Sequence, residues 1–129
     1  MAEAVILAVN GTLMRGLELN DNLLAAGARF VREARTAPEY RLYSINDVHP
    51  AMLRVKTGGK DICLELWEVP AAGLASILQA EPAGLAIGKV VLEDRSEVLG
   101  ILGEPWLCAA APEITQHGGW RAYVAARKR

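Results

Sequence analysis

The stretch AVILAVNGTLMRG, residues 4–16, joins a continuous apolar run to a polar, glycine-containing loop. Its apolar part predicts a buried strand over about residues 3–9, since hydrophobic side chains occupy almost every position. Asn10, Gly11 and Thr12 then interrupt the run with residue types that favour turns. A glycine-containing turn after a core strand can present successive backbone N–H groups to an anion. A β-turn that only leads into the next helix is the other interpretation, and the residues alone leave both open.

Downstream of this loop, the hydrophobic pattern predicts a mixed α+β fold with six or seven strands in total and three short helices. Asn20 suits a helix N-cap, Leu23 and Leu24 a buried edge, and Gly27 a helix end. Such a chain fits a small, strongly curved or closed sheet, a mixed β-barrel with two or three flanking helices. The later helices are expected at about residues 70–81 and from residue 119, and the later strands at 28–35, 40–45, 51–56, 62–69, 84–94 and 97–106.

Two of the expected strands are separated by a turn signal. Thr57-Gly58-Gly59-Lys60-Asp61 stands between residues 51–56 and 62–69. Glycine-rich turns of this kind connect antiparallel neighbours. We therefore expect these two strands to form a hairpin.

Composition limits the class of protein. The chain has 129 residues, of which 52% are hydrophobic and 22% charged, so we expect one domain over residues 1–129 with a real core. A net charge of −1 argues against a nucleic-acid partner. We see no signal peptide and no apolar run of membrane-spanning length, and therefore expect a cytoplasmic protein without a membrane partner. Cys63 and Cys108 are interpreted as two inert core thiols, and the three tryptophans as core or rim residues.

Five blocks of the sequence carry a family resemblance: AVNGTLMRGLELN, ARFVREARTAPEYRLY, LELWEVPAAGLASIL, AGLAIGKVVLEDRSEVLGILGE and EITQHGGWRAYVA. The most specific parts are TAPEYRLY, residues 36–43, and GGWRAY, residues 118–123. Through these blocks nearly the whole chain resembles the C-terminal domain of allophanate hydrolase, which is itself similar to the γ-glutamylcyclotransferase-like proteins. The resemblance implies a small β-barrel with flanking helices, and we expect a domain that stands alone, without the amidase domain that normally precedes it.

The resemblance also implies a binding loop after the first strand. The cyclotransferase-like proteins carry Tyr-Gly-Ser/Thr-Leu there, and this chain has Asn10 in place of the tyrosine. The candidate substrate-binding residues are therefore Asn10, Gly11, Thr12, Leu13 and Met14. The allophanate hydrolase pattern often has a histidine where this chain has Leu13, so the chain departs from its nearer relatives at a position implied in decarboxylation.

Two glutamates are candidate catalytic groups. Glu81 follows the helix of residues 70–81, at the place implied for the proton-carrying glutamate of the cyclotransferases, although an exposed helix-end glutamate is the alternative. The resemblance to the allophanate hydrolase domains implies an apolar residue there, so Glu81 agrees only with the more distant relatives. Glu65 lies in a strand that is apolar on both faces, so its carboxylate must find partners or shift its pKa upward. A purely structural ion pair with an arginine such as Arg41 or Arg54 is the alternative for Glu65.

The resemblance leaves three functions open. The first is binding, and decarboxylation or other processing, of a small carboxylated urea-like compound, a function of urea metabolism. The second is γ-glutamyl cyclotransfer with release of 5-oxoproline. The third is a non-catalytic module that docks on a separate amidase or forms a homodimer. No cofactor is expected, and no metal, because neither His49 nor His117 has a second ligand at metal spacing.

Overall fold

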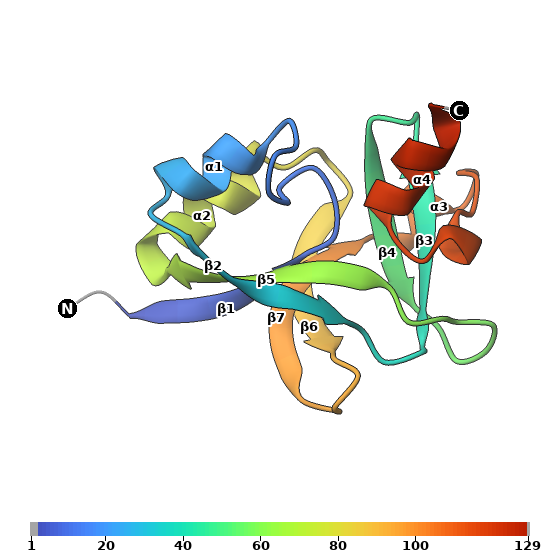
Figure 1. The fold of residues 1–129 in the computed structure, drawn as a ribbon, viewed down its shortest axis with the longest axis horizontal. Helices are drawn as coiled ribbons and strands as arrows, with labels where there is room; N and C mark the ends of the chain where they lie inside the picture. The colour runs from blue at the N-terminus through green and yellow to red at the C-terminus, as the bar shows by residue number, and fades with distance from the viewer. Residues whose placement is uncertain (1–2, 129) are drawn as a thin grey trace.

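The computed structural model of the protein describes residues 3–128 and has the expected mixed α+β class (Figure 1). Its larger sheet holds five strands in the order β2-β5-β1-β7-β6, and its smaller sheet pairs β3 with β4. In chain order the elements are β1 (Ala4–Val9), α1 (Asn20–Ala25), β2 (Arg29–Arg35), β3 (Tyr40–Ile45), β4 (His49–Arg54), β5 (Cys63–Pro70), α2 (Ala71–Ala80), β6 (Leu85–Val91), β7 (Glu97–Gly103), α3 (Pro105–Cys108), the 3-10 helix η1 (Thr115–His117) and α4 (Trp120–Arg127).

The predicted first strand is the centre of the larger sheet. β1 pairs antiparallel with β5 on one side and parallel with β7 on the other. Leu7 lies opposite both Trp67 of β5 and Leu99 of β7, and its side chain is fully buried. A central strand needs apolar side chains on both faces, which is why its sequence shows no alternation.

The larger sheet closes into a small barrel. Its two outer strands, β2 and β6, are continued by an antiparallel bridge between Thr36 and Leu92. The Ala37 amide donates to the Val91 carbonyl at 2.9 Å, and the Glu93 amide donates to the Arg35 carbonyl at 3.0 Å. Closure satisfies backbone groups that an open sheet edge would leave exposed. The expected closed, mixed sheet is confirmed.

The smaller sheet follows the predicted alternation but not the predicted hairpin. Tyr40, Leu42 and Ser44 share the buried face of β3, as their spacing predicts. The hairpin expected between residues 51–56 and 62–69 is wrong, because β4 pairs with β3 while β5 pairs with β1 and β2. The glycine-rich turn instead folds back on β3, where Tyr40 and Lys60 exchange backbone hydrogen bonds.

The helices lie at the two ends of the barrel. Figure 1 shows α1 and α2 together at one end and α4 at the other. Asn20 is the first residue of α1 rather than its N-cap, which is Leu19. Leu23 is buried as expected, but Leu24 is 53% exposed, so the prediction that both leucines are buried is wrong for Leu24. No helix among residues 3–128 is long and apolar enough to cross a membrane.

Two apolar predictions need correction. Cys63, the first residue of β5, is exposed, whereas Cys108 is buried as expected. Trp106 is 62% exposed on the short helix α3, although Trp67 and Trp120 are both buried. A four-residue helix at the surface has too little packed area to cover an indole ring.

Candidate functional site

The structure divides the predicted site residues between two concave regions. Asn10, Gly11, Thr12, Leu13 and Glu81 line a hollow of about 20 Å³ together with His49, Pro50, Leu85 and Ile101, which we call the Glu81 hollow. Met14 and Glu65 line a cavity of about 630 Å³ together with residues 32–35, 92–94 and 117–122, which we call the Glu65 cavity. The loop after β1 therefore borders both regions, and the two candidate glutamates do not share a site.

The loop after β1 is a compact turn that leaves backbone donors free. The Met14 amide donates to the Gly11 carbonyl at 3.0 Å, and the Leu19 amide donates to the Thr12 carbonyl at 3.0 Å. Within residues 3–128, the amides of Gly11, Thr12 and Leu13 donate to no acceptor. Free donors at the rim of a hollow are available to an anionic group.

Side chains on both sides of the loop fix its position. The Asn10 side chain donates to the Ile101 carbonyl at 3.0 Å and so points toward β7. The Asn20 side chain donates to the Leu13 carbonyl at 2.8 Å. Gly11 packs so closely on Pro50 that a Cβ there would lie 2.5 Å from the proline Cδ. Only a glycine allows this approach of the loop to β4.

Glu81 lines the same hollow and stands directly after α2. Its carboxyl group accepts no hydrogen bond from any side chain or backbone amide in residues 3–128. Burial among apolar neighbours such as Leu85 and Ile101 raises the pKa of Glu81 to about 7. Both the protonated and the ionised form are therefore populated near neutral pH, as a general acid or base requires.

Glu65 is buried, ionised and fully occupied by donors. Its Oε1 accepts the Arg15 amide at 2.9 Å and the Trp67 indole N–H at 3.1 Å. Its Oε2 accepts the Arg15 Nε at 3.2 Å and the Arg121 Nη2 at 3.1 Å. Burial alone would raise the pKa of the Glu65 carboxyl, but these hydrogen bonds outweigh it and hold the pKa below its ordinary value.

Neither Arg41 nor Arg54, the arginines expected as possible partners of Glu65, binds it. Arg54 pairs with Glu39 at 2.9 Å, and Arg41 lies 3.8 Å from Glu113. Both arginines belong to the smaller sheet, away from the Glu65 side chain on β5. Sequence reasoning missed the actual partners, Arg15 and Arg121, and no local pattern identifies them, because they lie 50 and 56 residues from Glu65 along the chain.

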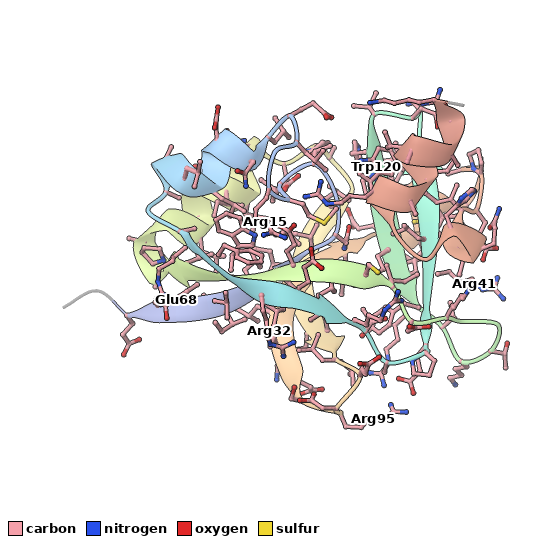
Figure 2. All side chains as sticks on the ribbon, in the orientation of Figure 1. Arg15, Arg32, Arg41, Glu68, Arg95 and Trp120 are labelled. Carbon is pink, nitrogen blue, oxygen red and sulfur yellow. The ribbon has the colours of Figure 1, made fainter. Side chains whose placement is uncertain are left out.

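Arg15 extends the cluster across the molecule. Its guanidinium also pairs with Glu33 of β2 at 2.9 Å and stacks over the Phe30 ring, 3.7 Å from the ring centroid. Arg121 of α4 donates to the Arg15 carbonyl as well as to Glu65. Figure 2 shows Arg15 above β5, on the same side as α1 and the Trp120 end of α4. The loop is thus tied to β2, β5 and α4 at once.

The two histidines have different surroundings. His49 begins β4, lines the Glu81 hollow and lies with its Nδ1 3.0 Å from the Pro50 carbonyl. His117 packs edge-on against Tyr123. Among the described residues 3–128, no three His, Cys, Asp or Glu side chains lie close enough together to hold a metal ion. Nothing in the sequence predicted that His49 would lie beside the Glu81 hollow.

Comparison with known proteins supports the resemblance stated from the sequence. The family model described as the allophanate hydrolase C-terminal domain matches residues 5–125. The urea amidolyase of Lachancea kluyveri is 29% identical in an alignment of 129 positions that covers 95% of this chain and 7% of that protein. The urea amidolyase of Saccharomyces cerevisiae is 28% identical over 127 residues. The chain therefore spans only about 7% of the length of these curated relatives.

Solved structures confirm the fold. A uropathogenic E. coli-specific protein, c4763, is 57% identical and superposes with a TM-score of 0.93, covering 95% of this chain and 96% of that one. The allophanate hydrolase of Kluyveromyces lactis is 30% identical, with a TM-score of 0.91, over 97% of this chain and 22% of that one. A γ-glutamyl cyclotransferase is 14% identical, with a TM-score of 0.53, over 78% of this chain and 67% of that one. This last likeness shows the predicted γ-glutamylcyclotransferase-like fold.

Proposed function

The chain belongs to the allophanate hydrolase C-terminal domain family, and from this we propose that it binds a small carboxylated urea-like compound at the Glu81 hollow and decarboxylates it. The observation that carries the proposal is that two features meet at one hollow. Gly11, Thr12 and Leu13, whose amides are unused, line it together with Glu81, whose carboxyl group has a pKa of about 7.

The amides supply the binding of the carboxylate. Backbone N–H groups that lack an internal acceptor can donate to a carboxylate oxygen without losing an existing bond. A hollow of about 20 Å³ has room for roughly one water-sized group. One oxygen of the carboxylate therefore enters the hollow, while the rest of the compound stays at its rim.

Glu81 supplies the proton that the reaction consumes. When an N-carboxylated urea loses CO₂, its C–N bond breaks and the bonding electron pair stays on the nitrogen. The protonated Glu81 donates its proton to that nitrogen, which leaves urea, CO₂ and an ionised glutamate that is reprotonated from water. Proton donation by a positioned side chain contributes roughly 10²–10⁴ in rate. The apolar neighbours of Glu81 favour uncharged CO₂ over the charged carboxylate.

The direct test is release of urea from allophanate by the purified chain, measured above the uncatalysed rate. We expect Glu81→Gln to lose about a hundredfold or more of this activity. The rate should fall as the pH rises through about 7, because the acid form of Glu81 is then lost. The matched control is Glu104→Gln, an exposed glutamate at the start of α3 that lines neither concave region and should therefore keep the activity. Absence of release by the wild-type chain, or full activity in the Glu81 variant, contradicts the proposal.

A second candidate function is γ-glutamyl cyclotransfer, which the same feature of Glu81 favours. In that reaction the carboxylate takes a proton from the attacking amine and returns it to the leaving nitrogen, as the amide C–N bond breaks and 5-oxoproline forms. The small volume of the hollow favours a carboxylate over a γ-glutamyl group. Release of 5-oxoproline from a γ-glutamyl dipeptide, with none of urea from allophanate, would select the second function.

A further inference from the structure

On the other side of the loop, the Glu65 cavity encloses about 630 Å³. Small-molecule sites occupy about 300–1,000 Å³, are mostly apolar, and carry a few polar groups that fix the ligand. The reaction proposed for the Glu81 hollow makes no use of this space. We propose that the Glu65 cavity is a second small-molecule site, which takes an organic monocarboxylate with an apolar body and binds its carboxylate at Arg121.

The Arg121 guanidinium is fixed in place by its hydrogen bonds and can still bind a carboxylate. Both of its hydrogen bonds use Nη2, which donates to Glu65 Oε2 and to the Arg15 carbonyl. Within residues 3–128, its Nε and Nη1 donate to no acceptor. The side chain is 46% exposed and lines the cavity. A guanidinium that is anchored by one nitrogen loses little freedom when its remaining donors bind a carboxylate.

The body of the ligand would meet an apolar floor. Met14, Leu64, Leu92 and Trp120 all line the cavity, and each side chain is at most 3% exposed. They come from the loop, β5, the β6–β7 turn and α4, so their positions are set by the core of the barrel. Burial of an aromatic or aliphatic group against such a surface yields about 25 cal/mol per Å².

The far end of the cavity determines how many carboxylates fit. Glu93 and Asp94 of the β6–β7 turn line that end, where Arg32 supplies one opposing charge. Arg35 also lines it, but its guanidinium is already paired with Asp61 at 2.8 Å. In Figure 1 this turn lies below β5, whereas α4, the helix that carries Arg121, lies above it. The excess of negative charge disfavours a second anionic group there. The class is therefore a monocarboxylate rather than a dicarboxylate.

Cys63 provides a readout of occupancy, because its exposed thiol lies in the cavity wall. Cys108 is buried, and burial raises the pKa of its thiol, so N-ethylmaleimide should modify Cys63 selectively in the folded chain. We expect phenylacetate to slow this alkylation saturably, by at least about threefold, since a bound ligand excludes the reagent. Acetate lacks the apolar body and 2-phenylethanol lacks the carboxylate, so neither should protect at the same concentration.

Two exposed alanines of α4 give a matched pair of variants. Ala122 lines the cavity and Ala126 lies one turn further along the helix, outside it. Ala122→Phe should fill the cavity and weaken phenylacetate binding about tenfold or more in an NMR titration, whereas Ala126→Phe should leave it unchanged. Arg121→Gln should weaken it similarly, and the alanine pair keeps the test valid if that variant is unstable.

The result separates this site from the proposed function. Glu81→Gln should abolish decarboxylation and leave phenylacetate binding intact, because Glu81 lies in the other concave region. Equal protection by 2-phenylethanol, no saturable protection of Cys63, or equal binding by the two alanine variants would each overturn the second site. None of these outcomes affects the assay of urea release.

Discussion

Arg15 binds both oxygens of the Glu65 carboxylate with two different parts of one residue. Its backbone amide donates to Oε1 at 2.9 Å, and its side-chain Nε donates to Oε2 at 3.2 Å. A hydrogen bond from the main chain fixes the backbone itself, which a side-chain ion pair alone would not do. The end of the binding loop is therefore positioned by a buried carboxylate on β5, and Glu65 acts as a positioning residue for the site that the loop borders.

Replacing Glu65 should cost stability far beyond an ordinary ion pair. Glu65→Gln leaves two guanidinium groups without their shared carboxylate, and we expect a loss of about 2–3 kcal/mol, reduced from the fully buried case because both arginines are half exposed. The control is Glu68→Gln on the same strand, where an exposed pair with Arg29 should contribute less than about 0.5 kcal/mol. Urea unfolding at pH 7 measures both, and equal losses would contradict the positioning role.

Glu81 should make stability fall as the pH rises. Its folded-state pKa of about 7 lies above its unfolded value, so the folded chain binds the proton more tightly and is favoured at low pH. Relative to Glu81→Gln, the wild type should lose up to about 3 kcal/mol between pH 4.5 and 7, and nothing further above that. Unfolding of both proteins by urea across this range gives the difference. A difference that does not vary with pH would show that Glu81 keeps an ordinary pKa.

Adding even one methyl group at Gly11 should destabilise the protein. A Cβ at this position would lie 2.5 Å and 2.7 Å from the Cδ and Cγ of Pro50, whose ring cannot rotate away. Gly11→Ala should therefore cost about 1–3 kcal/mol by overpacking, and should displace the amides of the loop that lines the Glu81 hollow. We expect malonate, as a small carboxylate, to raise the melting temperature of the wild type but not of this variant, which is the second readout.

Gly16 is the matched control for the Gly11 substitution. No atom lies within 4 Å of a Cβ placed there, but its φ of +75° strains any other residue. Gly16→Ala should cost only about 1 kcal/mol and preserve the response to malonate. If Gly11→Ala behaves like Gly16→Ala, the close approach to Pro50 does not hold the loop.

The Tyr40 hydroxyl should be required for barrel closure. The Val91 amide donates to it at 2.9 Å, and Tyr40 is fully buried, so Tyr40→Phe leaves that amide without an acceptor. We expect a loss of about 1–3 kcal/mol. Tyr43→Phe on the same strand should cost less than about 0.5 kcal/mol, because this tyrosine is half-buried and its hydroxyl forms no hydrogen bond within residues 3–128. Thermal or urea unfolding of the two variants decides between them.

Local patterns in the sequence predicted most of the helices and strands, but not which strands pair with each other. The unbroken apolar run before Asn10 predicted the central strand, and the alternation of Tyr40, Leu42 and Ser44 predicted a one-sided strand. The hairpin through residues 57–61 was wrong because a turn signal shows where a chain reverses, not which strand it then joins. β5 is taken by β1 and β2 through contacts between apolar side chains distant in sequence.

The candidate site was predictable only in part, for a related reason. A carboxylate in an apolar strand needs partners, and that much followed from the residues around Glu65. Its partners, however, come from a loop and a helix at opposite ends of the chain, and no local spacing identifies Arg15 or Arg121. Nor does local spacing show that Glu65 of β5 and Glu81 after α2 line different concave regions.

The position of β1 also has a consequence for folding during synthesis. Its two neighbours, β5 and β7, begin at Cys63 and Glu97, so the first strand has no partner until about half of the chain has left the ribosome, and lacks its second partner until β7 follows. Pairings of this sequence separation close slowly and leave apolar strands open to aggregation meanwhile. The nascent chain should therefore depend on chaperones such as ribosome-bound holdases until Glu97–Gly103 emerges, and a ribosome-arrested chain ending before β7 should remain sensitive to protease.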